Sequence, residues 1–302
     1  MKQIIKVCGK EIRITGRLLR IGRPEGDGYE SLAAPDSMVE GLRTSGIRID
    51  LFTFLQLRPE TSTKYQYPIE WDNAAVVPVS TFDHWWNRQI RPEARNRARQ
   101  AEKKGVVIRE VPFDDALVKG IWEIYNESPL RQGRRFPHYG EDLDTVYAES
   151  ATFLDSSFFV GAFLGDKLIG FVKLTTDETG TRANLMNILS LVEHRDKAPT
   201  NALIAHSVRA CATRGISQLV YQRFTYGNKQ ADGIMKFKQG NGFKQVDLPR
   251  YYVPMTALGW VAFRLGLHRP LVDHLPEPVA VKLRQLRNSW YGRKFQTVKE
   301  SV

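Results

Sequence analysis

The stretch FFVGAFL (158–164) runs through a Gly-Asp-Lys turn (165–167) into LIGFVKLTT (168–176). Both apolar segments are rich in β-branched and aromatic residues, which favour strands, and the Gly-Asp pair suits a tight turn. The segment TRANLMNILSL (181–191) has the same character and predicts a third strand. The region therefore begins as a hairpin followed by one more strand.

A helix is expected after these strands. Pro199 stands at its start and Gly215 just past its end, the positions where these two residues are favoured. Between them, one helical face collects four apolar residues: Leu203, Ile204, Val208 and Cys211. SQLVYQR (217–223) predicts the next strand, and a short helix closing in Gly242-Phe243 completes an α/β unit.

This order resembles the GNAT superfamily of N-acetyltransferases, as do the residues that close the unit: Asn228, Ala231, Phe237-Lys238 and Gly242-Phe243. The chain is more similar to the branch that contains the Fem-type peptidyltransferases. Like Fem-like chains, it has a basic helix, here ending in AEKKGV (101–106), before a strand, VVIREV (106–111). The resemblance covers residues 82 to 254 and implies an α/β GNAT fold, a mixed central sheet flanked by helices.

The length of 302 residues suggests one large or two fused units. Fem-type proteins consist of two GNAT-like copies, so the resemblance implies a degenerate GNAT-like half over residues 1–80. That half has alternating strand patterns, the best of them RIDLFTFLQL (48–57), and a short helix at Pro35–Leu42. We expect the acyltransferase domain over residues 81–254 and a basic helical extension over residues 255–302.

The two cysteines, Cys8 and Cys211, lie far apart and form no CxxC motif, so neither a disulfide framework nor a zinc site is indicated. No metal is expected. The first residues lack a signal-peptide core, and no apolar run approaches the ~20 residues of a membrane span. These features favour a cytoplasmic protein, with peripheral contact at the inner membrane face as an alternative.

The formal net charge of +11 indicates an anionic partner. Seven basic residues crowd one stretch: Arg88, Arg91, Arg95, Arg97, Arg99, Lys103 and Lys104. A solvated helix face explains such a stretch as well as a binding surface does. Nucleic-acid binding would favour interleaved aromatic residues and a known module, and neither is evident, so RNA is a minor hypothesis.

The resemblance places a cofactor pyrophosphate at the loop before the Pro199 helix, where a helix N-terminus offers free N–H groups to phosphate. The family pattern there is Arg or Gln, two residues, Gly, one residue, then Gly or Ala. This chain has neither glycine, and Pro199 lacks an N–H, so an ordinary connecting loop is the alternative. The expected cofactor is an acyl-CoA, with acetyl-CoA as the default, and its expected contacts are Leu191, Val192, Arg195, Lys197, Ala198, Thr200, Asn201 and Asn228.

Catalytic groups are less evident. Many acetyltransferases have a tyrosine where this chain has Phe237. Tyr226 is the expected acid, and the alternatives are Tyr221 or the absence of such an acid. The family's base is often a Glu on the preceding strand, which strand 181–191 lacks. Glu193 and His194 follow that strand directly and are the candidate bases, since a base must reach the proton it accepts. Positioning alone is the alternative.

The acceptor is expected at the loop after the helix that contains Leu117 and Ile121. This loop combines groups that suit carboxylates, phosphates or sugar rings, namely Arg131, Arg134, Arg135, His138 and Tyr139. They predict an anionic or sugar-linked acceptor. A basic surface loop with Phe136 in the core is the alternative.

The C-terminal segments ALGWVAFRLGL (257–267) and PEPVAVKLRQLRNSWYGRKF (276–295) predict basic amphipathic helices. Such helices can lie on an anionic membrane, although packing on the protein itself is the more common use. We therefore expect an acyl-CoA-dependent N- or O-acyltransferase. The alternatives are a Fem-like transferase that takes its group from aminoacyl-tRNA, so that tRNA is the partner, and a non-catalytic binding module. The oligomeric state stays open.

Overall fold

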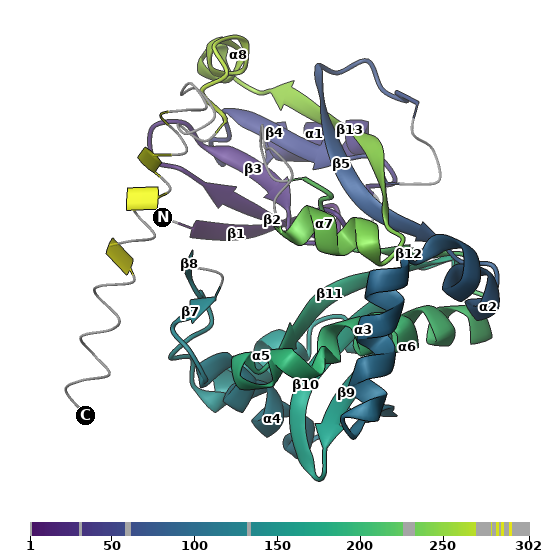
Figure 1. Ribbon diagram of the computed structural model, residues 1–302. Coiled ribbons are helices and arrows are strands. Elements are labelled where there is room, and N and C mark those ends of the chain that lie inside the picture. Colours follow the sequence, from purple (N-terminus) through teal and green to yellow (C-terminus); the bar gives the residue numbers. More distant parts are fainter. Residues whose placement is uncertain are drawn as a thin grey trace. The chain divides into compact units, whose positions relative to one another are not determined.

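The computed structural model describes residues 2–29, 32–57, 62–131, 134–225 and 233–269, with isolated positions between 279 and 291 (Figure 1). Contacts divide the chain into two compact units. Unit 1 comprises residues 1–74, 223–228 and 245–276. Unit 2 comprises residues 75–222, 229–244 and 277–302. Tyr226 and Asn228 and most of segment 276–295 fall outside the described residues.

Unit 2 is built on a mixed sheet. Its strand order is β6–β9–β10–β11–β12–β5, and only β11 and β12 run parallel. The strands are β6 (Val106–Val111), β9 (Ser157–Leu164), β10 (Lys167–Thr176), β11 (Arg182–Ser190), β12 (Gln218–Val220) and the second half of β5 (Ile69–Pro78).

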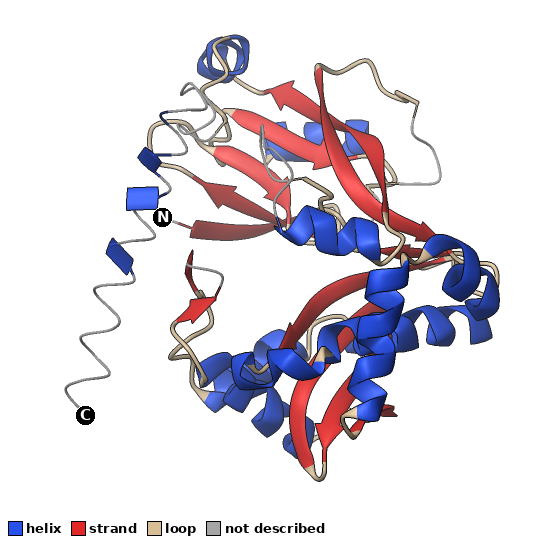
Figure 2. Ribbon diagram, viewed as in Figure 1, coloured by secondary structure: helices blue, strands red, loops and turns tan. Residues whose placement is uncertain are grey.

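Helices cover both faces of this sheet (Figure 2). Successive residues of a strand point to opposite faces. Phe171 on β10 faces Tyr125 of α4, whereas the neighbouring Gly170 faces Leu203 of α6. The helices and short elements of unit 2 are α2 (Phe82–His84), η1 (Trp85–Gln89), α3 (Pro92–Lys103), α4 (Asp115–Asn126), β7 (Leu130–Arg131), β8 (Arg134–Arg135), α5 (Leu143–Ser150), η2 (Leu154–Ser156), η3 (Val192–Lys197), α6 (Pro199–Thr213) and α7 (Gly233–Gly240).

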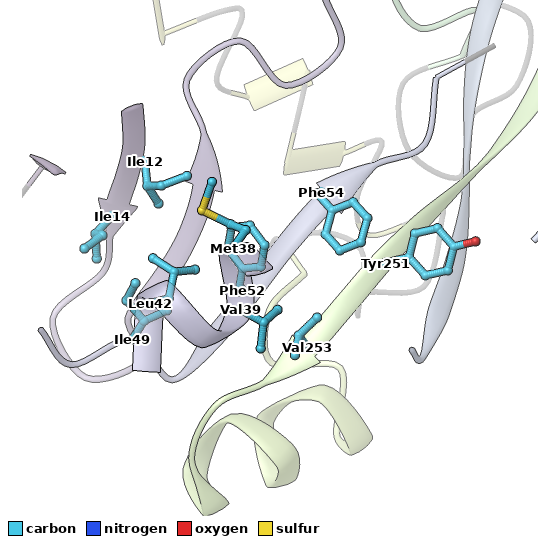
Figure 3. Close-up of a cluster of buried hydrophobic side chains, with 10 residues drawn as sticks. All are labelled: Ile12, Ile14, Met38, Val39, Leu42, Ile49, Phe52, Phe54, Tyr251 and Val253. Atoms are coloured by element: carbon cyan, nitrogen blue, oxygen red, sulfur yellow. The ribbon is translucent and has the colours of Figure 1, made fainter. Parts of the chain in front are cut away.

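Unit 1 has a smaller sheet with the order β1–β2–β3–β4–β13. Its elements are β1 (Lys2–Val7), β2 (Lys10–Thr15), β3 (Ile21–Pro24), α1 (Pro35–Thr44), β4 (Leu51–Leu55), the first half of β5, β13 (Lys244–Pro254) and α8 (Ala257–Arg264). Helix α1 packs its apolar face on the sheet, and Figure 3 shows the resulting core, in which Phe54 stacks on Tyr251.

The two units repeat one strand order. Each has antiparallel strands, then a parallel pair joined through a helix, then an antiparallel strand from a distant part of the chain. In unit 1 the parallel pair is β3 and β4, joined through α1, and β13 follows. In unit 2 the pair is β11 and β12, joined through α6, and β5 follows. Unit 1 thus repeats the strand order of unit 2 in a shorter form, and the descent of this half from a GNAT-like copy stays a prediction.

The elements expected from the sequence are confirmed over most of unit 2. The hairpin over residues 158–176 is β9 and β10, the third strand is β11, and the Pro199 helix is α6. Residues 245–254 lie in unit 1, although they were expected within one domain over residues 81–254. No helix in the described part of the chain combines the length and apolar character needed to cross a membrane.

Candidate functional site

The parallel strands of unit 2 separate soon after they pair. β11 and β12 are in register only from Arg182↔Gln218 to Asn184↔Val220, and β11 then continues alone on that side to Ser190. The first four residues of β11 are buried, and the last five, from Met186 to Ser190, are half buried. A parallel pair that splays in this way leaves strand backbone accessible, so the carboxyl half of β11 is our candidate site.

The loop after β11 folds back on itself. Residues 192–197 form the short 3-10 helix η3, and Ala198 follows in the left-handed region with φ +53°. Within the loop, the His194 N–H donates to Leu191 and the Ala198 N–H to Arg195, both to carbonyl oxygens. Because Pro199 has no N–H, few backbone donors of this loop remain for a phosphate.

Glu127 accepts the first two donors of η3. Its carboxylate oxygens lie 2.6 Å from the Val192 nitrogen and 2.9 Å from the Glu193 nitrogen. Arg131 donates to the Ser190 carbonyl oxygen at 2.7 Å, with Glu127 3.4 Å away. An anionic side chain from the loop after α4 therefore stands at the helix N-terminus, where an anion is favoured.

The candidate bases lie in a chain of charged groups. Glu193 is exposed and 2.9 Å from the Lys167 ammonium, and this hydrogen bond lowers the pKa of Glu193. His194 has Glu193 3.3 Å from Nε2 and the Lys197 amine 3.3 Å from Nδ1. A lower pKa makes Glu193 a weaker base, so His194 is the better placed of the two.

The expected cofactor contacts Thr200 and Asn201 begin α6. Thr200 Oγ1 lies 3.2 Å from the Ser190 hydroxyl, and the Asn201 amide donates to Asn241 Oδ1 at 3.2 Å. These bonds join the end of β11, the start of α6 and the end of α7. Leu191 and Ala198 are buried, whereas Arg195 is exposed and Lys197 half buried.

Lys238 on α7 is a fully buried lysine that the sequence did not single out for a role. Its ammonium donates to the Tyr221 carbonyl oxygen at 3.1 Å and lies 4.2 Å from the Tyr221 ring. Tyr221 directly follows β12, so this cation sits at the carboxyl end of the splayed pair. The Phe237-Lys238 pair was the sequence signal, and burial is what distinguishes the lysine.

The side chains of the predicted acceptor loop fall into a buried group and an exposed group. Arg131 is largely buried and packs over Phe136, itself buried. Arg134 and Arg135 are exposed on β8, and Tyr139 is exposed. The structure thus gives Arg131 a packing role and leaves the other three side chains accessible to an anionic acceptor.

His138 of this loop belongs to a cluster that could bind a metal ion. Its Nδ1 lies 3.1 Å from Glu141 and 3.2 Å from Glu149, and the three ligand atoms are within 4.8 Å of one another. The ring stacks on Tyr125, whose pKa is raised by burial and then by Glu149 and Glu141. A hydrogen on Nδ1 would also join His138 to both carboxylates without a metal ion.

No aromatic residue interleaves the basic stretch itself, but one of its arginines lies over an aromatic ring from the preceding segment. Phe82 stacks on Trp86 with centroids 5.5 Å apart. The Arg209 guanidinium lies over Phe82 at 4.2 Å, and that of Arg99 over Trp86 at 5.5 Å. We call these four residues the arginine–aromatic ladder. Its rings precede the basic stretch, and Arg209 comes from α6, which sequence adjacency could not reveal.

Comparisons with known proteins find no matching family model and no matching curated protein. Solved structures do match. FemX is 11% identical with a TM-score of 0.56, over 82% of this chain and 87% of that one. L-PGS from Bacillus licheniformis is 13% identical with a TM-score of 0.56, over 87% of each chain. The C-terminal domain of a proposed lysylphosphatidylglycerol synthetase from Agrobacterium fabrum is 13% identical with a TM-score of 0.55, over 87% of each.

At identities this low, the matches show a shared fold and nothing about function. The chain therefore has a GNAT-type fold, of the kind seen in FemX and L-PGS.

Proposed function

We propose that this protein is an acyl-group transferase that takes an aminoacyl group from aminoacyl-tRNA and passes it to an anionic acceptor. The coarser statement, a transferase, rests on the fold shared with FemX and L-PGS. The choice of donor rests on one observation, the state of the loop between β11 and α6.

That loop offers little to a CoA pyrophosphate. Pyrophosphate binding at a helix N-terminus depends on backbone N–H groups that point to the ligand. Here Glu127 takes the N–H groups of Val192 and Glu193, and Pro199 contributes none. A second anion would meet the Glu127 carboxylate, and like charges at short distance repel.

The arginine–aromatic ladder supports an RNA partner. Arg99 and Arg209 are exposed, and within the described residues neither has an ion-pair partner. Arg88 and Arg97 are also exposed nearby in the chain. Unstacked nucleotides bind to aromatic rings and guanidinium planes, and unpaired cations attract the phosphate backbone.

The chemistry needs a stabilised oxyanion. An acceptor amine attacks the ester carbonyl of the aminoacyl group, and the tRNA ribose hydroxyl leaves with the proton that the amine loses. Negative charge develops on the carbonyl oxygen, and a buried cation stabilises such charge strongly. Lys238, at the carboxyl end of the splayed pair, is suited to this role. Arg134 and Arg135 would receive the anionic acceptor.

An acyl-CoA donor, with acetyl-CoA as the default, is the second candidate. The half-buried backbone at the end of β11 favours it, because a pantetheine chain can pair with an open strand. Arg195, which is exposed, would then meet the phosphates. Leu191, Val192, Lys197, Ala198, Thr200 and Asn201 remain its predicted contacts.

Equilibrium binding distinguishes the donors. Uncharged tRNA and acetyl-CoA are titrated separately into the full chain at several salt concentrations. We expect tRNA to bind with an affinity that falls steeply with salt, with a log–log slope of about −0.7 to −0.9 for each phosphate contact. Acetyl-CoA should leave the thermal midpoint unchanged. A midpoint raised by acetyl-CoA, with no tRNA binding, overturns the proposal.

A charge-matched pair of variants locates the RNA surface. Arg99→Glu with Arg209→Glu should weaken tRNA binding by at least about tenfold and flatten the salt slope. Arg17→Glu with Arg43→Glu changes the net charge equally on exposed positions of unit 1. Equal losses from both variants would mean that tRNA responds to net charge alone.

A further inference from the structure

Helix α8 of unit 1 buries small residues and exposes most of its large apolar ones. It packs on the unit through Gly259 and Ala262, both buried. A Cβ on Gly259 would lie 1.6 Å from the Asp50 carbonyl oxygen, so this contact requires glycine. Phe263 is half buried, and the other large apolar residues on the helix and just after it are exposed: Leu258, Trp260, Val261, Leu265 and Leu267.

This arrangement is held firmly. Thr256 caps the helix by accepting the Gly259 N–H, and its own hydroxyl donates to Asp50 Oδ1 at 2.9 Å. After the helix, His268 and Arg269 bind Glu70 on β5 at 2.9 and 2.6 Å. Phe263 packs against Tyr252 and His268. The helix cannot simply turn its leucines inward, because both ends are fixed.

An exposed cluster of large apolar side chains on a fixed helix marks an interaction surface. Three of them, Leu258, Val261 and Leu265, recur at spacings of three and four and form one stripe. Beside the stripe, the Arg264 guanidinium lies 4.8 Å from the Trp260 ring. The partner must accept apolar side chains, an indole and a cation together.

Charge indicates which partner this is. Residues 255–269 contain two arginines and no aspartate or glutamate. The next segment of the chain, residues 276–295, has five basic residues and one acidic residue, so it is repelled by Arg264 rather than attracted. A second copy would bring the same positive charge. The interface of an anionic bilayer accepts leucine and valine among its acyl chains, tryptophan at headgroup depth and arginine at the phosphates.

We propose that α8 is an interfacial membrane helix, which docks unit 1 on anionic lipid through Leu258, Val261, Leu265 and Trp260. This inference rests on unit 1 alone and holds whichever donor unit 2 uses. At eight residues, the helix lies on the surface and does not cross it.

Vesicle flotation of the full chain tests the proposal. Vesicles of phosphatidylcholine are compared with vesicles that also contain phosphatidylglycerol. We expect binding to the anionic vesicles only. The variant Leu258→Gln, Val261→Gln, Leu265→Gln should lower the partition coefficient at least about tenfold. The three side chains are exposed, so its thermal midpoint should match that of the wild type.

Two matched variants complete the test. Leu18→Gln with Trp71→Ala removes exposed apolar residues elsewhere in unit 1, and we expect it to bind vesicles normally. Leu283→Gln with Leu286→Gln removes exposed apolar residues of the C-terminal segment. Loss of binding in this last variant, with the α8 variant unaffected, overturns the proposal. So do equal binding to both vesicle types and a wild-type dimer that the α8 variant converts to monomers.

Discussion

Units 1 and 2 repeat one strand order but finish their parallel strands differently. In unit 2, β11 continues for six residues past its last pairing with β12, and its final residues stay half buried. In unit 1, β3 stops at Pro24, and Asp27 follows. The Asp27 carboxylate accepts the N–H of Leu55 at 2.9 Å and pairs with Arg250 at 2.7 Å. A buried ion pair therefore closes the first copy at the place where the second stays open.

This difference between the two parallel pairs indicates which unit can bind a substrate at its strand end. Strand backbone that is accessible at the end of a parallel pair can receive a substrate. In the described residues of unit 1, the Asp27–Arg250 ion pair occupies this end instead. The buried Arg250 guanidinium also binds Asp72 at 3.1 Å, so it has two carboxylate partners. Unit 2 has an open strand end, a buried Lys238 and the arginine–aromatic ladder, whose arginines are exposed and whose rings are half buried. These features support the proposals of transfer at unit 2 and surface attachment through unit 1.

The largest expected effect comes from breaking the ion pair that closes unit 1. Arg250→Met removes the buried cation between Asp27 and Asp72, which in the described residues keep only the more exposed Arg23 and Arg223. Loss of one partner of a buried pair costs about 3–5 kcal/mol. Chemical denaturation measures the free energy of unfolding. Arg43→Met, on an exposed arginine of the same unit, should change it by less than about 0.5 kcal/mol. Equal changes in the free energy of unfolding for the two variants would show that the buried ion pair stabilises unit 1 no more than an exposed arginine does.

A smaller effect concerns Lys173, a buried cation of unit 2 for which the described residues provide no carboxylate partner. Lys173 is 1% exposed and donates to the carbonyl oxygens of Ser150 and Thr152 at the end of α5. Burial lowers its pKa from 10.5 to about 8. Between these values the unfolded chain holds a proton that the folded protein has released, so the free energy of unfolding rises with pH.

The rise should be on the order of 2–3 kcal/mol across that window. Denaturation curves at pH 8 and near pH 10.5 measure it. Lys173→Met should abolish the rise, whereas Lys119→Met, on an exposed position of α4, should retain it. A wild type whose stability falls steadily over this range would contradict the burial of an uncompensated charge.

The smallest expected effect is at the Glu127 cap. Glu127→Gln keeps one oxygen acceptor but removes the charge that faces the Val192 and Glu193 N–H groups, a loss of about 1–2 kcal/mol. Hydrogen exchange should accelerate at these two amides. Glu123→Gln, on the exposed side of α4, serves as the control. Unchanged exchange in Glu127→Gln would mean that the carboxylate does not hold η3.

Much of the fold was predictable because its signals are local. The hairpin of β9 and β10 follows from two apolar segments around a Gly-Asp turn, and α6 from Pro199 and the Gly215 that follows it. The strands that complete each sheet are different. β13 pairs with β4 across about two hundred residues, and no local pattern reports such a pairing.

The candidate site was predictable only in part. The loop between β11 and α6 lies where the sequence pattern predicts a connection, and its role stays a prediction. Glu127 reaches this loop from 65 residues away, and no sequence pattern indicates that contact. The charge of Arg131 predicts a contact with an anionic acceptor. In the structure its guanidinium donates to the carbonyl oxygens of Ser190 and Ile124. Tyr226 and Asn228 lie outside the described residues and stay predictions. The arginine–aromatic ladder could not be predicted from the sequence, because it depends on the packing of α6 beside α3, which brings Arg209 to Phe82.

The most direct test of the account is a transfer assay with both donors in parallel. The protein is incubated with total bacterial lipid and envelope-precursor extract, together with either labelled aminoacyl-tRNAs or labelled acetyl-CoA. We expect label to move from aminoacyl-tRNA into the extract, and Lys238→Met to reduce the rate at least about a hundredfold. Transfer from acetyl-CoA alone, or transfer from aminoacyl-tRNA that Lys238→Met leaves unchanged, would contradict the account.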